Sequence, residues 1–268
     1  MPRSIFVKTA FVAATLTVST TALACTREGL IKAANSYLTA QIAGNPGALS
    51  LAATNFTYSQ NNKVSSLATG LLSTPLTIDL SRITADTVAC ASYTMWINAS
   101  GTKPYVVSTQ IRHADNNTTT ISSIDTVAAT TGDLFFDAAK TLSYIRAETW
   151  TPLPSSSQPS RALLKSFGDA YLDMWTNATA ADTISWGTQC ERVEGSMYTT
   201  PCGANLPHGG SKKANGMRRY VIDETMGSVQ ISCQFDSLGA WPDSHEIRVE
   251  GGKVRYVHTV TVMRGVGA

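Results

Sequence analysis

The stretch from residue 242 to residue 263 holds the densest group of side chains that could do chemistry: His245, Arg248, Arg255, Tyr256 and His258. The sequence Glu250–Lys253 contains two glycines and predicts a tight turn, so the stretch is expected to form a two-stranded hairpin. Imidazole and phenol groups move protons or donate hydrogen bonds to a developing charge. The hairpin is therefore either a catalytic cluster or a sheet with a polar face.

Side chains alternate between the two faces of a strand. This places His245 on the apolar face that should pack against a helix and line a pocket, and His258 with Tyr256 is expected to face the same pocket. The catalytic candidates are His258, His245 and Tyr220. The alternative is that both histidines are hydrogen-bonded core residues.

Aromatic side chains elsewhere could line an apolar pocket. The candidates for substrate binding are Tyr256, Trp186, Trp175 and Tyr58, although such residues also form ordinary cores. No third ligand completes a metal site with the two histidines at a recognisable spacing, and no nucleotide-binding motif is present. The sequence therefore leads us to expect neither a metal ion nor a cofactor.

The first 24 residues have the pattern of a secretory signal peptide. Arg3 and Lys8 precede a short apolar stretch, and Ala22-Leu23-Ala24 forms a cleavage motif. A lipid-modified Cys25 is the alternative, but Ala22 stands where leucine would be expected. Removal of residues 1–24 lowers the formal charge from +2 to zero, so a nucleic-acid partner is not expected. No later segment is apolar enough to span a membrane.

A secreted chain can keep disulfides. Cys190 and Cys202 flank a loop rich in Gly, Thr and Pro and are expected to pair, and Cys25 is expected to pair with Cys90. Cys233 lies in an apolar run and is expected to be a buried free thiol. Five sequons predict glycosylation at Asn55, Asn98, Asn116, Asn117 and Asn177.

The sequence contains an internal repeat. A shift of 134 positions superimposes residues 26–45 on residues 160–179, and both segments have apolar residues three and four apart, as in a helix. A shift of 136 pairs Arg112 with Arg248, and it places Thr120 and Ser122 at the positions of Tyr256 and His258. We therefore expect two copies of one structural unit. The second copy is the better candidate for a working pocket, because Tyr256 and His258, like Trp186 and Tyr220, have no counterparts in the first.

Each copy is expected to consist of a helix, a short strand and three long strands. The long strands of the first copy are predicted at residues 85–98, 103–114 and 118–130, and those of the second copy at residues 218–235, 244–250 and 253–263. A helix wrapped by such a curved antiparallel sheet gives an α+β cone. The predicted boundaries are 25–150 for the first unit, 151–160 for a Pro- and Ser-rich linker, and 161–268 for the second unit. Arg112 and Arg248 are expected at the seam where the outer sheet faces meet, with Glu246 among their partners.

The strings CTREGL, WGTQCERVEG, RRYVIDETMG and PDSHEIRVEGGKVRYVHT resemble a family of secreted fungal proteins of largely unknown function. The arrangement of elements is similar to the NTF2-like, or SnoaL-like, cone, here as a tandem that forms a pseudo-dimer. Some secreted members of this type act in tropolone–sesquiterpenoid pathways as hetero-Diels–Alderases without a cofactor. The resemblance therefore implies a pericyclase that joins a polyketide-derived quinone methide to a terpene.

Three functions follow as expectations. The first is a cofactor-free secreted enzyme that acts on a hydrophobic secondary metabolite, with the pericyclase as its most specific form. The alternative is a non-catalytic secreted protein that binds a small apolar ligand. A third reading is an effector that binds a host protein through an exposed apolar patch. Either a monomer with an internal pseudo-dimer or a homodimer fits the repeat.

Overall fold

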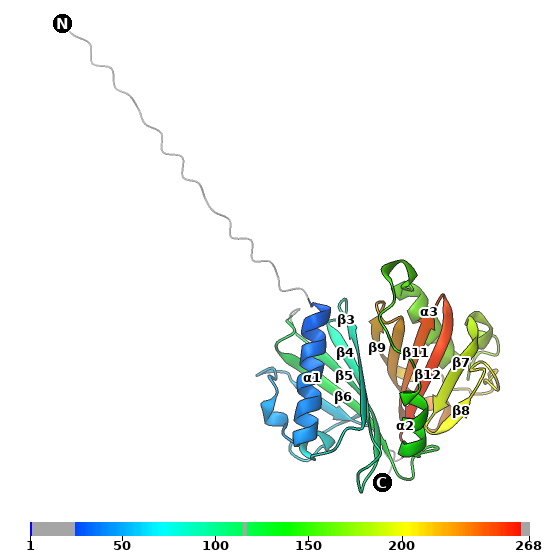
Figure 1. Ribbon diagram of the computed structural model, residues 1–268, viewed down its shortest axis with the longest axis horizontal. Helices are drawn as coiled ribbons and strands as arrows, with labels where there is room; N and C mark the ends of the chain where they lie inside the picture. Colours follow the sequence, from blue (N-terminus) through cyan, green and yellow to red (C-terminus); the bar gives the residue numbers. More distant parts are fainter. Residues whose placement is uncertain (2–24, 115–116, 264–268) are drawn as a thin grey trace.

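The structure of the chain is a computed structural model, which describes residues 1, 25–114 and 117–263. Apart from Met1, the predicted signal peptide lies outside the described residues. Among the described residues, three α-helices and two six-stranded sheets form two similar halves of α+β type. Figure 1 shows the two sheets next to one another, with α1 against one of them and α3 against the other.

The first half begins with a helix and continues with strands. Its elements are α1 (Arg27–Ala43), β1 (Thr57–Gln60), β2 (Lys63–Val64), β3 (Leu80–Asp86), β4 (Ala91–Asn98), β5 (Tyr105–His113) and β6 (Ile121–Thr130). Helix α2 (Ala138–Arg146) follows and leads to the second half. The elements of the second half are α3 (Arg161–Asp173), β7 (Trp186–Glu194), β8 (Met197–Thr199), β9 (Gly216–Asp223), β10 (Ser228–Phe235), β11 (Trp241–Glu250) and β12 (Lys253–Thr261).

Both sheets have the same topology. The strand orders are β2-β1-β6-β5-β4-β3 and β8-β7-β12-β11-β10-β9. Neighbouring strands are antiparallel except that β1 runs parallel to β6 and β7 runs parallel to β12. The predicted duplication is thus confirmed at the level of two similar halves.

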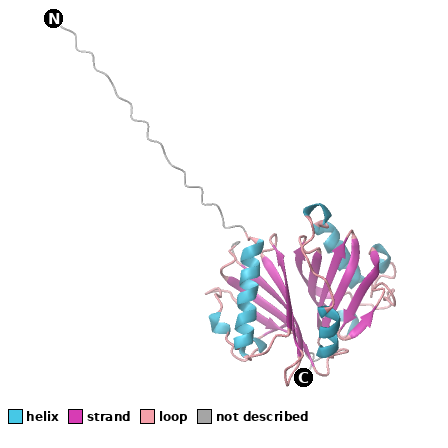
Figure 2. Ribbon diagram, viewed as in Figure 1, coloured by secondary structure: helices cyan, strands magenta, loops and turns pink. Residues whose placement is uncertain are grey.

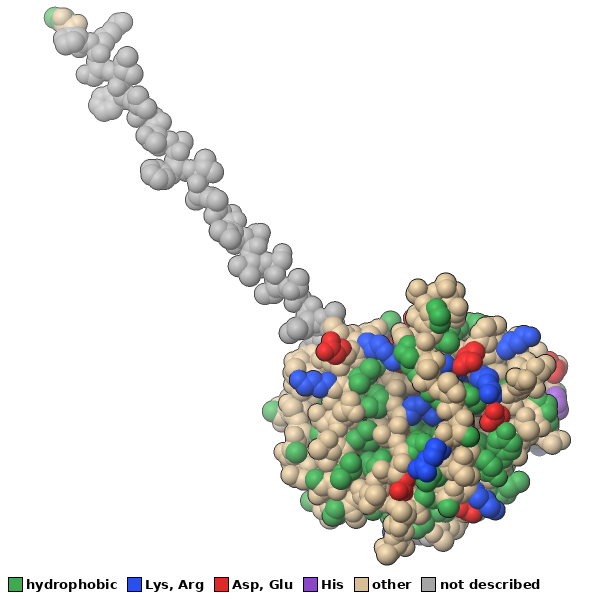
Figure 3. Space-filling model, viewed as in Figure 1, with side chains coloured by type: hydrophobic (Ala, Val, Ile, Leu, Met, Phe, Trp, Pro, Cys, Tyr) green, Lys and Arg blue, Asp and Glu red, His purple; other side chains and the backbone are tan. Residues whose placement is uncertain are grey.

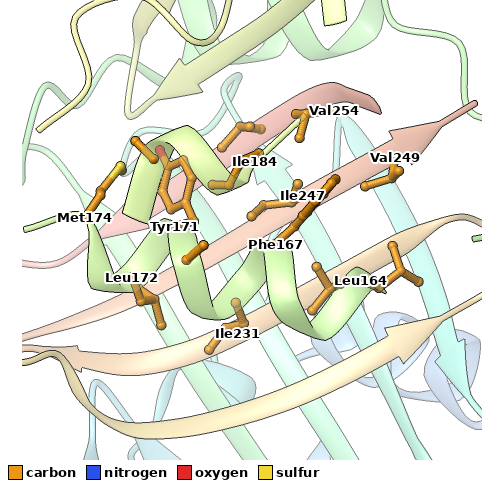
Figure 4. Close-up of a cluster of buried hydrophobic side chains, with 14 of the residues drawn as sticks. Leu164, Phe167, Tyr171, Leu172, Met174, Ile184, Ile231, Ile247, Val249 and Val254 are labelled. Atoms are coloured by element: carbon orange, nitrogen blue, oxygen red, sulfur yellow. The ribbon is translucent and has the colours of Figure 1, made fainter. Parts of the chain in front are cut away.

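The predicted helix starts are confirmed. The side chains of Thr26 and Ser160 cap α1 and α3 by accepting hydrogen bonds from Gly29 N and Leu163 N. Each helix packs on one face of its own sheet, which we call the inner face. Figure 4 shows α3 on the inner face of the second sheet, with Ile231 and Ile247 beneath it.

The first long strand predicted in each copy is wrong, because each is a hairpin. Residues 85–98 turn at Thr87–Cys90, between β3 and β4. Residues 218–235 turn at Glu224–Gly227, between β9 and β10. β-branched residues lie on both sides of these turns, so strand propensity alone predicts one continuous strand across each turn. The hairpin turned by Glu250–Lys253 is present as predicted, as β11 and β12.

The faces of the sheets that do not carry α1 or α3, which we call the outer faces, meet one another (Figure 2). Their contact is partly apolar, and its core includes Tyr93, Met95, Val221 and Val260. Helix α2 covers one end of it through Ala138 and Ile145. Both faces of both sheets are therefore buried, and the strands cannot be sorted into an apolar and a solvated side.

Strand pairing corrects the alignment of the repeat. Gln110 pairs with Asp125 in the first half, and Glu246 pairs with His258 in the second. The counterpart of His258 is thus Asp125 rather than Ser122. By the same register, the counterpart of Tyr256 is Ser123 rather than Thr120, because Arg112 pairs with Ser123 and Arg248 pairs with Tyr256.

Two disulfides join Cys25 to Cys90 and Cys190 to Cys202, as expected. Cys233 is a buried free thiol, also as expected. No helix in the described part of the chain has the length and apolar character needed to cross a membrane. In Figure 3, basic, acidic and hydrophobic side chains are interspersed on the face in view.

The predicted glycosylation sites differ in accessibility. Asn55 and Asn177 are exposed, and Asn117 is half-buried. Asn98 is only 1% exposed, and its Nδ2 donates a hydrogen bond to Thr77 O, so the folded protein has no room for a glycan there. Asn116 lies outside the described residues.

Candidate functional site

The two candidate histidines lie on opposite faces of the second sheet. In the β11–β12 pairing, His245 is opposite Thr259 and His258 is opposite Glu246. His245 points to the inner face, where Tyr171 of α3 lies with its ring centroid 5.2 Å away. His258 points to the outer face, so the expectation that it shares a pocket with His245 is wrong. The error arose because the outer face is buried too.

A pocket of about 170 Å³ opens on the inner face of the second half. We call it the second-half cavity. Its wall combines apolar side chains with a few polar ones, among them Leu134, Phe135, Trp175, Phe235, His245 and Thr259. Leu134 and Phe135 come from the loop before α2, which belongs to the first half. This cavity is completed only when the two halves are together.

Aromatic rings surround His245 within the cavity. Besides Tyr171, Phe235 lies 5.8 Å from the imidazole and Trp175 lies 6.5 Å away, measured between ring centroids. His245 itself is 1% exposed. The imidazole thus lies among aromatic rings on a wall that also includes polar side chains such as Arg192, Glu194 and Thr259.

Two further polar residues stand behind His245. Asp243 lies two residues earlier on β11, and Cys233 pairs with Asp243 across the β10–β11 ladder. His245 Nε2 is 2.7 Å from Asp243 Oδ2. Both Asp243 and Cys233 are fully buried. Burial raises the pKa of the Cys233 thiol well above its ordinary value, and the neighbouring Asp243 carboxylate raises it further.

A polar pair borders the cavity on the β7 side. Arg192 Nε lies 3.3 Å from Glu194 Oε2, and Tyr171 Oη donates a hydrogen bond to Glu194 Oε1 at 3.1 Å. Burial, followed by the Glu194 carboxylate, raises the pKa of Tyr171 well above its usual range. Arg192 also donates to Cys202 O and Ala204 O, which ties the loop closed by the second disulfide to the sheet.

The equivalent positions of the first half are filled differently. Strand pairing makes Trp96 the counterpart of Cys233, and Thr109 the counterpart of His245. Tyr37, the counterpart of Tyr171, accepts a hydrogen bond from Trp96 Nε1 and bonds Thr109 Oγ1 at 2.9 Å. An indole fills the inner face there and its polar groups are satisfied. Reactive side chains thus occupy in the second half the places that packing residues occupy in the first.

His258 belongs to a buried charge cluster between the halves. Its Nε2 is 2.7 Å from Glu148 Oε1, and its Nδ1 is 3.2 Å from Glu246 Oε2. Arg82, from the first half, donates to the same Glu246 oxygen at 2.6 Å, and its Nη2 lies 2.8 Å from His258 Nδ1. Glu148 also accepts a hydrogen bond from Trp150 Nε1.

These contacts favour the charged form of each member of the cluster. Burial alone would lower the pKa of His258, but the Glu148 and Glu246 carboxylates together raise it above its ordinary value. Burial alone would raise the pKa of Glu246, but Arg82 and His258 together lower it to about 2. With His258 protonated, Arg82 and His258 are two donors that share one acceptor oxygen. The cluster is an ion network rather than a group poised to exchange protons with a ligand.

The two repeated arginines lie at the outer faces, where they were expected. Arg112 donates to Tyr220 O across the seam and to Gln110 Oε1. Arg248 donates to Glu250 at 2.6 Å and to Thr151 O at 2.8 Å, so its partner is not Glu246. Both arginines hold structure together, one across the seam and one to the linker.

The remaining candidates are scattered. Tyr256 lies on the outer face, where its hydroxyl accepts a hydrogen bond from Thr149 N. Tyr220, near α3, donates to Asp169 at 2.5 Å, and burial with the Asp169 carboxylate raises its pKa to about 12. Trp186 donates to Ala181 O beside α3. Tyr58 is in the core of the first half. Of the predicted site residues, His245 and Trp175 line the second-half cavity.

Sequence reasoning missed Asp243, Arg192 and Phe135. The i, i+2 spacing of Asp243 and His245 was a usable signal, because it places both on one strand face. Nothing in the sequence brings Phe135 to the second half, since that contact depends on how the halves pack. A larger depression of about 500 Å³ lies beside α1, but none of its lining side chains has a buried polar atom without a partner.

Comparison with family models matches the second half of the chain. A family model described as a domain of unknown function (DUF8021) matches residues 157–261, from just before α3 to the end of β12. No curated protein matches the chain. The matched region contains Asp243, His245 and Cys233, but not Leu134 or Phe135. This chain thus resembles that domain over its second half.

Proposed function

We propose that the protein is a secreted enzyme that acts on a hydrophobic secondary metabolite in the second-half cavity. The observation that carries the proposal is the imidazole of His245, which lines the cavity among aromatic rings at the position that Thr109 occupies in the first half. A mostly apolar pocket with a few convergent polar groups is the usual form of a small-molecule site.

The volume of the cavity and the apolar side chains at its rim fit an apolar ligand that is partly enclosed and extends out over the rim. An engineered cavity of about 150 Å³ binds benzene, so the enclosed volume of about 170 Å³ takes one ring. At the rim, Phe135 and Leu238 are 54% and 45% exposed. A ligand that extends over these two side chains would bury apolar surface that otherwise faces water.

The reaction we propose is a hetero-Diels–Alder addition. The enclosed ring is a polyketide-derived quinone methide, and the partner is a terpene held over the rim. One carbon–carbon and one carbon–oxygen bond form together at the expense of two π bonds, and no atom is lost, so the step needs alignment and polarisation of the quinone methide oxygen rather than an organic cofactor. The polar end of the cavity at His245 supplies the polarisation.

The fold assignment that goes with this function is a tandem of NTF2-like, or SnoaL-like, cones that form a pseudo-dimer. Two similar halves, each with a helix on the inner face of a six-stranded sheet, support it. The two disulfides support secretion.

Purified protein is incubated with a quinone methide precursor and a cyclic sesquiterpene olefin, and adduct formation is followed by mass spectrometry. His245→Gln should lower the rate of adduct formation by about 100-fold or more, the range found when a polarising group is removed. His208→Gln, on an exposed loop, is the matched control and should keep the rate. Equal rates for the wild type and His245→Gln would refute the enzymatic proposal.

Ligand binding separates the enzyme from the carrier. Trp175 lies in the cavity wall, so a bound aromatic ligand should quench its fluorescence. Quenching with no adduct under any condition would identify the protein as a non-catalytic binder of an apolar ligand.

A further inference from the structure

The β10–β11 ladder brings three potential metal ligands to one point. Cys233 and Asp243 are directly opposite one another, and His245 follows Asp243 on the same strand face. One ligand atom from each residue lies within 4.8 Å of the others. All three side chains are at most 1% exposed. Within the described chain, a thiol, a carboxylate and an imidazole are thus gathered in an apolar interior.

Three polar atoms of this group lack hydrogen-bond partners. Neither nitrogen of His245 forms a hydrogen bond, and neither does Oδ2 of Asp243. Yet His245 Nε2 lies only 2.7 Å from that same oxygen. The two atoms are thus in contact without hydrogen-bond geometry, so the binding capacity of both is unused. Burying polar atoms without partners is unfavourable, so this geometry fits a shared ligand better than a simple His–Asp pair.

The surrounding contacts orient the carboxylate. Oδ1 of Asp243 accepts hydrogen bonds from Thr261 Oγ1 and from Ser244 N, both at 2.9 Å. Oδ2 has no hydrogen bond and lies 2.7 Å from His245 Nε2. Hydrogen bonds to the second atom of a ligand are the usual way in which a protein fixes a metal site.

We propose that Cys233, Asp243 and His245 bind a divalent transition metal, Zn²⁺, at the inner end of the second-half cavity. Thiolate, imidazole and carboxylate are the ligand types that Zn²⁺ takes. With bonds of about 2.0–2.3 Å in a tetrahedral site, binding would move Asp243 Oδ2 and His245 Nε2 apart from their 2.7 Å separation and bring the Cys233 thiolate to the same ion. The thiol releases its proton on binding, so the ion is balanced by one thiolate and one carboxylate.

Three protein ligands leave a fourth position open, as in catalytic zinc sites. His245 lines the cavity, and it is through the cavity that the fourth position reaches a ligand. In terms of the proposed function, on which this step alone rests, the ion would polarise the carbonyl oxygen of the enclosed ring. The metal site itself does not depend on that function.

The test uses the full disulfide-bonded chain after dialysis against a chelator. Titration with Co²⁺ should give a thiolate-to-metal charge-transfer band in the near ultraviolet that saturates at one ion per chain, and Zn²⁺ should displace it. Cys233→Ser should abolish the band. Asp243→Asn and His245→Gln should each weaken Co²⁺ affinity by about tenfold or more.

Ser232→Ala changes a buried neighbour of Cys233 on the opposite strand face and should bind Co²⁺ like the wild type. His208→Gln controls for binding by a surface imidazole. No band, or a band that survives Cys233→Ser, would overturn the proposal. Adduct formation by the metal-free wild type would support the proposed function and show that it does not need the metal. A saturating band without any adduct would support the metal site and count against the proposed function.

Discussion

Arg161 binds both carboxylate oxygens of Asp86, with Nη1 2.7 Å from Oδ1 and Nη2 2.8 Å from Oδ2. Arg161 begins the helix of the second half, and Asp86 ends β3 of the first half. The relationship is repeated in reverse, because Arg27 begins α1 and lies 2.5 Å from Asp223 at the end of β9. Each half therefore gives one arginine and one aspartate to the other.

Backbone contacts complete the exchange. Asp86 Oδ2 accepts a hydrogen bond from Ile222 N, and Asp223 Oδ2 accepts one from Ala85 N, both at 2.8 Å. Both carboxylates are at most 1% exposed. Buried charges need such partners, so the two halves are joined by specific polar contacts as well as by the apolar seam.

We expect Arg161→Ala to lower the free energy of unfolding by about 1–3 kcal/mol. Loss of one partner of a buried pair leaves the other charge uncompensated, although Arg161 is partly exposed and three backbone amides still serve Asp86. Urea denaturation measures the change. Lys165→Ala removes the exposed helix pair with Asp169 and should cost at most about 0.5 kcal/mol. Equal losses for the two variants would contradict this account.

We expect stability to fall as the pH rises above neutrality, because of His258. Its pKa is raised in the folded state by the Glu148 carboxylate, against the opposing effect of burial. Such a group contributes stability that is complete below its unfolded pKa of about 6.5 and is lost as the pH rises through the folded value.

Urea denaturation at a series of pH values checks this expectation. His258→Gln should lower the free energy of unfolding at pH 6 and flatten its decline above neutrality. His208→Gln should keep the slope of the wild type. A His258→Gln variant with an unchanged slope would show that another group is responsible.

Substitutions at two glycines with the same φ angle distinguish the cost of backbone strain from the cost of a steric clash. Gly227 and Gly251 both have φ of +57°. A Cβ at Gly227 would lie 2.4 Å from Val249 O, whereas nothing lies within 4 Å of one at Gly251. Gly251→Ala should cost about 1 kcal/mol from the left-handed conformation alone. Gly227→Ala should cost about 1–3 kcal/mol more from the clash, and equal thermal or urea midpoints would disprove it.

Local features were predictable from the sequence. Thr26 and Ser160 as helix caps, the hairpin at Glu250–Lys253 and the two disulfides depend on short-range patterns, and the structure confirms them. The duplication was also readable, because a helix signal and a strand signal recur at nearly the same spacing.

The predictions that were wrong concerned features that depend on packing between elements. His258 was assigned to the pocket because a sheet usually has one buried face, and here both are buried. The repeat was aligned three residues out of register at β6 and β12, because the hairpin loops differ in length. The meeting of Cys233 with Asp243 depends on the β10–β11 register, which no single strand reveals.

Because Leu134 and Phe135 come from the first half, the second half depends on the first to complete its cavity. A homodimer of one unit would repeat every substitution twice and would have to keep two identical cavities. A fused chain is free of that symmetry, so the position that holds Trp96 in one half can hold Cys233 in the other. The first half then serves as a scaffold and contributes Leu134 and Phe135 to the wall of the second-half cavity. A second half expressed alone would lack the part of the cavity wall that Leu134 and Phe135 form.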